Sequence, residues 1–422
     1  MEQMPQNSVS LYDLLRVQGS MFFNRSNSSK RKPTAAQNED LEDEFIPTEM
    51  SQCFAKERKR PHIMENDKEN DCGQFVLSKR SRRKKDCAQK ISWDQLPDEL
   101  LLRILWCLPL QDLLRTARVC QRWNRLVFDE SLWNSVDLVG MSSAGPALQQ
   151  LLKNKVRRLR CPRTFVGDLQ LSEHGTLQLV QLDLSSSTIS TVTLESILSR
   201  CRQLECLSLE GLKLSDPIIS SLADNTSLVQ LNLCGCSGFN APVLGDLLKS
   251  CTRLEQLNIS WCIFDSDHVK SIVNHVSPSV THLNLSGYRE TLNLDDVKVL
   301  VKRCPNLLTL DLNDSSLLMA DCLQVLAQLP RLQHLCLSRC YHIHLAALTD
   351  VGTLFPSLCQ LDIFGLVTES HQPLLKNEMP HININSQPFS NVGRPTPACP
   401  VGGGMERLMW DKACRLSFKT WH

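Results

Sequence analysis

The chain has little that would place it in a membrane or among highly charged proteins. The longest apolar run near the middle of the sequence covers only residues 104–110, whereas a membrane-spanning helix needs about 20 residues. No long apolar stretch stands near the N-terminus, so no secretory signal is expected. The net charge is +1, from 46 Lys and Arg against 45 Asp and Glu, which excludes a polybasic nucleic-acid coat or an acidic tail as the main feature.

Glycine, proline and aromatic residues are also scarce. The 17 Gly and 20 Pro among 422 residues are too few for a collagen-like or mostly disordered chain, and aromatic residues make up 5%, so an aliphatic core is expected. Leucine is abundant instead, with 70 residues, of which 65 follow residue 90. The 19 cysteines, without a secretory signal, indicate reduced thiols in the cytosol or nucleus rather than a disulfide framework.

One apolar pattern recurs ten times over residues 154–385, with starts 21 to 27 residues apart. An apolar residue is followed by any two residues, a second apolar residue, any one residue and a third apolar residue, which is typical of leucine-rich repeats. The copies begin at Val156, Leu179, Leu204, Leu228, Leu254, Val280, Leu307, Leu332, Leu358 and Met379.

The segments between the copies have helical spacing. Leu244, Leu247, Leu248 and Cys251 stand at i, i+3, i+4 and i+7, which predicts one apolar stripe on a helix. Neither a short strand nor such a helix can bury its apolar face alone, so neighbouring repeats must stack. We therefore expect an α/β fold: a leucine-rich-repeat horseshoe solenoid of about ten strand–helix repeats, with a concave parallel sheet and a convex helical face.

Cysteines recur in two columns of this repeat. They could form a metal or redox site, or they could be buried fillers that recur because the repeat recurs; we favour the second interpretation, since Cys is among the most buried residue types. Cys336 lies between two core leucines and should face away from the core that buries Cys340, so these two and nearby His342 and His344 are not expected to share a zinc ion. No metal and no cofactor is predicted. The columns are Cys201, Cys251 and Cys304, and Cys236, Cys262 and Cys340.

Residues 91–135 read as a compact module of three short helices. Leu101, Ile104, Leu105 and Leu108 form an apolar stripe on the first helix, which Pro109 ends. Three short helices enclose too little core to hide this much apolar surface. Part of it is expected to stay exposed for a partner; the alternative is that it packs against the first repeats.

The flanking segments differ from both modules. Residues 1–90 are polar with blocks of one charge sign, which predicts a disordered regulatory arm. The arm contains two basic clusters, residues 56–60 and 79–85, typical of nuclear import signals, nonspecific nucleic-acid contacts or solvated charge, and a KEN-like degron at residues 68–70. Residues 386–422 are too apolar for a solvated linker, so this tail is predicted to fold over the concave face.

Three stretches of the helical module resemble an F-box: residues 96–100, 119–123 and 129–133. An F-box followed by cysteine-containing leucine-rich repeats resembles the F-box/leucine-rich-repeat substrate receptors of SCF-type cullin–RING ubiquitin ligases. The adaptor-binding residues predicted from the resemblance and the apolar pattern are Leu96, Pro97, Leu100, Leu101, Ile104, Leu105, Leu108, Leu113, Val119, Cys120 and Trp123.

The resemblance also implies a set of partners. A Skp-family adaptor would bind the F-box and bring the cullin and the RING subunit, while a Cks-family accessory protein would supply a phosphate-binding pocket. Substrates would be phosphorylated cell-cycle regulators such as Kip-type inhibitors of cyclin-dependent kinases, with cyclin–kinase complexes as further partners. The implied location is nucleus and cytoplasm, with no membrane and no specific nucleic acid as partner.

Large side chains gather just past the ends of the later strands, at positions where earlier repeats have Gly211 and Gly235. Aromatic and arginine residues on a rigid scaffold are typical of protein contacts; solvated loop residues are the alternative. The residues predicted to bind substrate or accessory protein are Trp261, Tyr288, Arg289, Asp314, Arg339 and Tyr341, with Trp410 from the tail.

Catalysis by the chain itself is not expected. The sequence has no P-loop, no HExxH, no GxSxG and no Gly-rich dinucleotide turn. The alternative function is a leucine-rich-repeat scaffold or inhibitor without a ubiquitin role, and binding to a Skp-family adaptor distinguishes the two.

Overall fold

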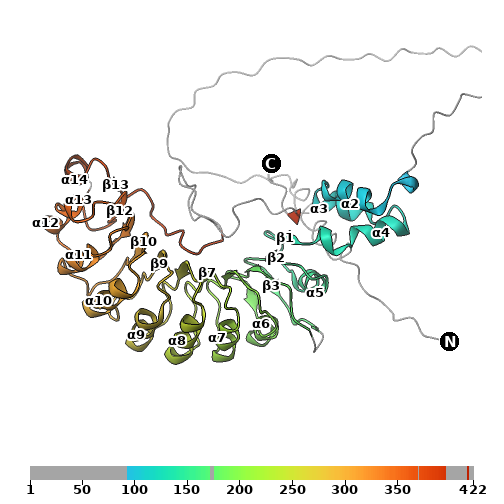
Figure 1. Cartoon of the computed structure of the whole chain (residues 1–422), viewed down its shortest axis with the longest axis horizontal. Helices are drawn as coiled ribbons and strands as arrows, with labels where there is room; N and C mark the ends of the chain where they lie inside the picture. Colours follow the sequence, from blue (N-terminus) through green and yellow to red (C-terminus); the bar gives the residue numbers. More distant parts are fainter. Residues whose placement is uncertain (1–92, 172–174, 369, 396–415, 418–422) are drawn as a thin grey trace, which may run out of the picture. The chain divides into compact units, whose positions relative to one another are not determined.

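The computed structural model describes residues 93–171, 175–368, 370–395 and 416–417 (Figure 1). The predicted N-terminal arm, its degron and basic clusters, and Trp410 lie outside the described residues. Within the described part of the chain, no helix has both the length and the apolar character to cross a membrane. Trp93–Gln95 forms a short 3-10 helix, η1.

The helical module contains the three predicted helices. Pro97 and Pro109 each precede a helix as its N-cap, a place where a missing N–H costs nothing. Asp98 in the first turn of the first helix accepts hydrogen bonds from Arg122 at 2.9 Å and from Arg125, which ties it to the third helix. The elements are α2 (Asp98–Trp106), α3 (Leu110–Thr116), α4 (Gln121–Val127) and a 3-10 turn, η2 (Glu130–Leu132).

A parallel sheet runs through the repeats in chain order from β1 to β13, and the last strand, β14, pairs with β1 at the other edge. The central apolar residue of each strand pairs with that of the next, as in Leu231 with Leu257 and Leu257 with Leu283, so the core leucines form one continuous row. Its strands are β1 (Ser135–Asp137), β2 (Arg158–Arg160), β4 (Gln181–Asp183), β6 (Cys206–Ser208), β7 (Gln230–Asn232), β8 (Gln256–Asn258), β9 (His282–Asn284), β10 (Thr309–Asp311), β11 (His334–Cys336), β12 (Gln360–Asp362), β13 (Asn383–Ile384) and β14 (Leu416–Ser417).

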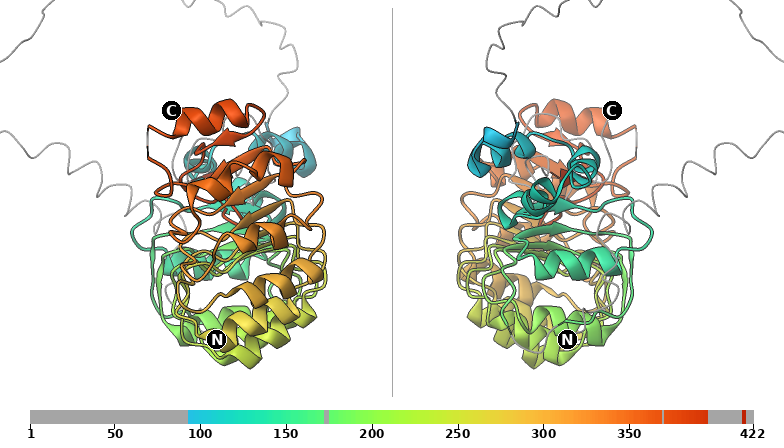
Figure 2. Two further views of the ribbon diagram at one scale, coloured as in Figure 1. Left: turned by 90° about the vertical axis from the view of Figure 1, so that its left-hand side faces the viewer. Right: turned by 90° about the vertical axis from the view of Figure 1, so that its right-hand side faces the viewer.

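Helices cover the outer side of this sheet, and Figure 1 shows them along the outside of the repeat arc. The side views in Figure 2 show helices of successive repeats stacked on one another. The predicted horseshoe solenoid is therefore confirmed, and all ten predicted copies contain a strand. The helices are α5 (Gly145–Lys153), α6 (Thr191–Leu198), α7 (Asp216–Ala223), α8 (Ala241–Ser250), α9 (Ser266–His275), α10 (Leu294–Arg303), α11 (Asp321–Leu326), α12 (Leu345–Leu348), α13 (Val351–Leu354) and α14 (Gln372–Glu378); β3 (Phe165–Val166) and β5 (Thr188–Ile189) form a separate pair.

The sheet begins earlier than the predicted boundary at residue 154. Strand β1 pairs with β2 on one side and with β14 on the other, so it belongs to the repeat array. Trp133, Val136 and Leu138 are all buried at 0–1% exposure and repeat the apolar spacing of the other copies. A tryptophan in place of the first leucine conceals this copy in the sequence.

The two cysteine columns are buried, as predicted. In one column the thiol donates to a carbonyl of the preceding repeat: Cys236 Sγ to Leu209 O at 3.1 Å and Cys262 Sγ to Leu233 O at 3.1 Å. Burial raises the pKa of the Cys262 thiol to about 12. Such a thiol stays protonated at neutral pH, which makes it a packing residue rather than a nucleophile.

Residues 386–395, here named the crossing segment, lie against the inner side of the sheet. Asn258 Nδ2 donates to Val392 O at 3.0 Å, and Gly393 N donates to Gln256 Oε1 at 3.2 Å. Gly393 has a φ of 62°, and a Cβ there would stand 3.2 Å from Leu231 O. Glycine thus permits the close approach of this backbone to β7 and β8.

Candidate protein-interaction surfaces

Part of the apolar surface of the helical module, which resembles an F-box, is exposed. Leu100 and Ile104 stand one helical turn apart on the same side of α2, and they are 44% and 41% exposed. Val119, between α3 and α4, is 63% exposed, and Pro97 and Cys120 are exposed as well. These five residues are named the F-box apolar face. Apolar side chains left in water in this way are typical of a docking surface.

The remaining predicted adaptor contacts are less accessible. Leu101, Leu105 and Leu113 are 2%, 3% and 0% exposed, because α2 and α3 pack against α4. These three residues are therefore corrected from adaptor contacts to core residues of the module. Leu96, Leu108 and Trp123 are half-buried.

A left-handed residue follows the strand in successive repeats, and its identity changes along the solenoid. Glycine occupies this position at Gly211, Gly235, Gly287 and Gly365. Trp261, Asp314 and Arg339 occupy it with φ of 56°, 59° and 61°. A non-glycine residue in this region costs on the order of 1 kcal/mol, and such strain is concentrated at functional sites. After β8, β10 and β11 the rim thus carries large side chains at an energetic cost.

The strain argument makes a direct prediction at Ser186, an exposed residue with a φ of 55° at the same position of its repeat. Ser186→Gly is expected to raise the free energy of unfolding by about 1 kcal/mol, because glycine adopts this φ without strain. Ser221→Gly in α7 is the matched control and should lower it by about 1 kcal/mol. Urea unfolding of both variants measures the difference in the free energy of unfolding. Destabilisation by Ser186→Gly would contradict the assignment of strain to the left-handed position after the strand.

The large rim side chains contact one another. The Asp314 carboxylate is 2% exposed; it accepts from Arg289 Nη2 at 3.0 Å and from Arg339 Nε at 2.7 Å. The Arg339 guanidinium lies 5.8 Å from the centre of the Trp261 ring. Trp261 in turn lies over Gly287, where a Cβ would stand 2.7 Å from the ring. Buried Asp314 therefore positions Arg289 and Arg339, and Arg339 contacts Trp261.

Trp261, Arg289, Asp314, Arg339 and Tyr341 are named the rim patch. Trp261 and Tyr341 are 44% and 61% exposed, which leaves two aromatic rings open to a partner. Aromatic and arginine side chains held in place by their neighbours are the residues that contribute most at protein interfaces.

Tyr288 does not belong to this patch, contrary to the sequence prediction. Its side chain is 2% exposed, its hydroxyl donates to Ile259 O, and its ring stacks on Phe264 at 6.0 Å. Glycine at position 287 takes the left-handed conformation, and the side chain that follows turns into the core.

A cleft of about 520 Å³ lies between the rim patch and the crossing segment. Trp261, Arg339 and Tyr341 line one part of it, and Pro388 and Phe389 line another. Phe389 is 61% exposed and was missed by the sequence analysis. The signal for it is an apolar Pro-Phe pair within an otherwise polar stretch.

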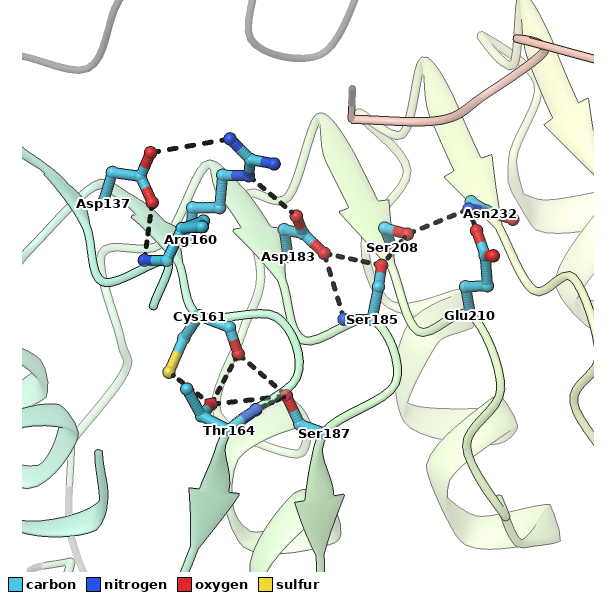
Figure 3. A network of polar contacts seen from close by, with 11 residues as sticks. Asp137, Arg160, Cys161, Thr164, Asp183, Ser185, Ser187, Ser208, Glu210 and Asn232 are labelled. Carbon is cyan, nitrogen blue, oxygen red and sulfur yellow. Dashed lines mark hydrogen bonds and ion pairs between the residues drawn. The ribbon is translucent and has the colours of Figure 1, made fainter. Parts of the chain in front are cut away.

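The inner face near the N-terminal repeats is polar but internally paired (Figure 3). Arg160 bridges Asp137 at 3.5 Å and Asp183 at 3.2 Å, while Asp183 also accepts from Ser185 N at 3.0 Å. Burial nonetheless raises the pKa of both carboxyls above their usual range. The polar groups of Asp137, Arg160 and Asp183 are hydrogen-bonded to one another and to the backbone, so this row stabilises the turns.

Comparison with known proteins agrees with this architecture. Residues 146–417 match the family model described as the SKP2 LRR domain, and residues 93–139 match the model described as F-box-like. The chain belongs to the SKP2 LRR domain family. Its solenoid therefore consists of SKP2-type leucine-rich repeats that follow an F-box-like domain.

Individual relatives are named for an F-box and leucine-rich repeats. F-box/LRR-repeat protein 12 from Homo sapiens is 33% identical over 143 residues, which is 34% of this chain and 40% of that protein. Putative F-box/LRR-repeat protein 22 from Arabidopsis thaliana is 24% identical over 261 residues, which is 60% of this chain and 71% of that protein. The chain thus spans less than half the length of the first relative.

Among solved structures, an internalin from Listeria monocytogenes aligns with 58% of this chain and 70% of that one. Identity is 19% and the TM-score is 0.39, so this likeness carries no argument about function.

Proposed function

We propose that the chain is the substrate-recognition subunit of an SCF-type cullin–RING ubiquitin ligase. The observation that carries the proposal is the exposed F-box apolar face, with Leu100, Ile104 and Val119, on a domain followed by SKP2-type repeats. In this proposal a Skp-family adaptor covers the apolar face and recruits the cullin and the RING subunit. The rim patch and its cleft receive the substrate.

The finer proposal concerns the substrate. Residues 207–212, 214–218 and 337–341 resemble the S-phase kinase-associated F-box protein. We propose phosphorylated cell-cycle regulators, in particular Kip-type inhibitors of cyclin-dependent kinases, as substrates, with a Cks-family accessory protein and cyclin–kinase complexes as further partners. Arg289, Arg339 and Asp314 give the rim patch a net charge of +1, which is too small to bind a phosphate tightly. An accessory protein with its own phosphate site would supply the positive charge that the rim patch lacks.

The chain's contribution to the reaction is proximity. A receptor that holds substrate and ligase together turns transfer of ubiquitin into an effectively intramolecular step, with effective concentrations in the millimolar range for short connections. No thiol or carboxylate of the receptor takes part in bond making under this proposal. Degradation of the substrate follows from the ubiquitin chain that the ligase core builds.

Reconstitution tests the proposal. Full-length chain with Skp-family adaptor, cullin, RING subunit, Cks-family protein and the ubiquitin enzymes should ubiquitinate a phosphorylated Kip-type inhibitor at least tenfold faster than the unphosphorylated one, since phosphate binding contributes about 1.5–3 kcal/mol per charge-assisted hydrogen bond. Adaptor binding without ubiquitination of any phosphorylated cell-cycle protein would contradict the substrate class. No adaptor binding at all would favour the alternative, a scaffold or inhibitor without a ubiquitin role.

We also propose nucleus and cytoplasm as the location. The cysteine-rich composition, with no secretory signal expected, and the basic clusters at residues 56–60 and 79–85 support this, and both clusters lie outside the described residues. A reporter fused to residues 50–90 should accumulate in the nucleus, and a uniform distribution would contradict the proposal.

A further inference from the structure

Three side chains of different chemistry meet near the C-terminal end of the sheet. His334 and Cys336 stand at alternate positions of β11, so they face the same inner side, and Cys336 pairs in register with Asp362 of β12. All three are buried, at 9%, 3% and 1% exposure. One ligand atom from each lies within 4.8 Å of the other two.

The three groups converge on one point rather than form a chain. His334 Nε2 lies 2.7 Å from Asp362 Oδ2 and 3.0 Å from Cys336 Sγ, and Sγ lies 3.8 Å from the same Oδ2. A Cys–His–Asp relay would use both ring nitrogens, one toward each partner. Here the thiol and the carboxylate both approach Nε2, so the arrangement does not activate a nucleophile.

Asp362 Oδ2 and His334 Nε2 are the two atoms on which the cluster converges. Oδ2 lies 2.7 Å from Nε2 and also accepts from Gln360 Nε2 at 2.9 Å, while the Cys336 thiol lies 3.0 Å from the same Nε2. A single cation at the centre would interact favourably with all three groups at once. The carboxylate, buried at 1% exposure, also favours a positive charge beside it.

Cys336 does not fill the usual role of its position in the repeat. In six other repeats this third strand residue is an Asp or Asn that caps its own turn, as Asn258 does for Ser260 N at 3.2 Å and Asn284 for Ser286 N at 2.9 Å, while Arg160 and Ser208 occupy it in two more. The equivalent Ser338 N is capped by Asn313 of the preceding repeat instead, at 2.6 Å. Turn capping therefore does not account for a cysteine here.

The donor set fits zinc. Imidazole nitrogen, thiolate sulfur and carboxylate oxygen are its three usual ligand types, at about 2.0–2.3 Å, and a tetrahedral site places ligand atoms about 3.4–3.6 Å apart. To reach that spacing, His334 Nε2 must move about 0.7–0.9 Å away from the Asp362 oxygen and about 0.4–0.6 Å away from the Cys336 sulfur. Asp362 Oδ1 is already oriented by Gln387 N of the crossing segment at 3.2 Å.

We propose that His334, Cys336 and Asp362 bind one Zn²⁺ ion, which links β11 and β12 and, through Gln387, fixes the crossing segment beside the cleft. The thiol loses its proton to solvent on binding, and the fourth coordination position is left to water. The site is structural and is independent of the ligase role proposed above.

Cobalt substitution tests the site, because Co²⁺ reports a thiolate ligand by its charge-transfer absorption. Full-length chain in complex with its adaptor, or alone, is stripped with a chelator and titrated with CoCl₂ and then ZnCl₂. One equivalent of Co²⁺ should bind with a thiolate band, and Zn²⁺ should displace it. Cys336→Ser should abolish the band and Asp362→Asn should lower the affinity at least tenfold, as loss of a ligand demands.

Cys359→Ser is the matched control. Its thiol is exposed and bonds to Ser357 O, so both band and affinity should stay unchanged. Absence of a thiolate band in the native chain overturns the proposal, as does a band that persists in Cys336→Ser. If Cys336→Ser fails to fold, Zn²⁺ must still raise the melting temperature of the native chain and not that of Asp362→Asn; equal shifts overturn the proposal too.

Discussion

Ile104→Asp is expected to reduce binding of a Skp-family adaptor by about 100-fold or more while the chain stays folded. Ile104 is 41% exposed, so an aspartate there remains solvated in the unbound chain and costs little stability. In the complex the charge would be buried against an apolar partner without compensation, and central interface positions contribute about 2–4 kcal/mol. Isothermal titration of the purified chain with the adaptor measures the loss.

Val192→Asp is the matched control for this variant. Val192 lies on α6 and is 79% exposed, so it tests whether a new surface charge on any apolar residue impairs the protein. Its adaptor affinity should equal that of the native chain. Unchanged affinity of Ile104→Asp would show that the F-box apolar face is not the adaptor site, and the ligase proposal would lose its main support.

Leu105→Ala would test something different. Leu105 is 3% exposed inside the module, so truncation leaves a cavity and should lower the stability of the F-box by about 2–5 kcal/mol. Adaptor binding would then be lost through unfolding rather than through a missing contact. Thermal unfolding followed by circular dichroism distinguishes the two variants, since only Leu105→Ala should shift the transition.

The helical stripe shows where sequence reasoning reaches its limit. The spacing of Leu101, Ile104 and Leu105 correctly predicts a helix with an apolar side. It does not say which part of that side meets α4 and which part meets solvent, because this depends on the packing of three helices whose sequence separations carry no such information. Exposure separates Ile104 from its two neighbours only once the helices are placed.

The solenoid was more predictable because its periodicity is tied to its packing. Each repeat places its central leucine in register with the next, as Leu310 with Leu335, so a regular sequence period reports a regular structure. The sequence analysis missed the first repeat because Trp133 replaces a leucine. It missed the cluster of His334, Cys336 and Asp362 for another reason: His334 and Asp362 are far apart in the chain and meet only through the strand register.

The left-handed position that follows each strand was predictable from the glycines alone. Gly211 and Gly235 mark a position that needs a left-handed backbone, and the large residues at the same position in later repeats must tolerate it too. Neighbouring positions follow no such rule. Tyr288 comes directly after one of these turns, and the sequence gives no sign that its ring enters the core between repeats.

Trp261→Ala combined with Arg339→Ala should lower affinity for the accessory protein and phosphorylated substrate by about 100-fold. The Arg339 guanidinium lies over the Trp261 ring, 5.8 Å from its centre, and Asp314 fixes the guanidinium, so the native patch loses little conformational freedom on binding. Removing both takes away the exposed aromatic face and its cation, and anchors of this kind contribute about 2–4 kcal/mol. Fluorescence polarisation with a labelled phosphopeptide and the accessory protein measures the effect.

Arg163→Ala with Phe165→Ala is the matched control, an exposed arginine and aromatic pair near the N-terminal repeats. Arg163 has the same left-handed backbone, with a φ of 54°, so the control also places an alanine in that conformation, as Arg339→Ala does. Its affinity should match that of the native chain. If both double variants weaken binding equally, the partner contacts the whole rim and the later repeats have no special role. If neither does, the strain at Trp261 and Arg339 serves another purpose, and the cleft beside Phe389 is not the docking site.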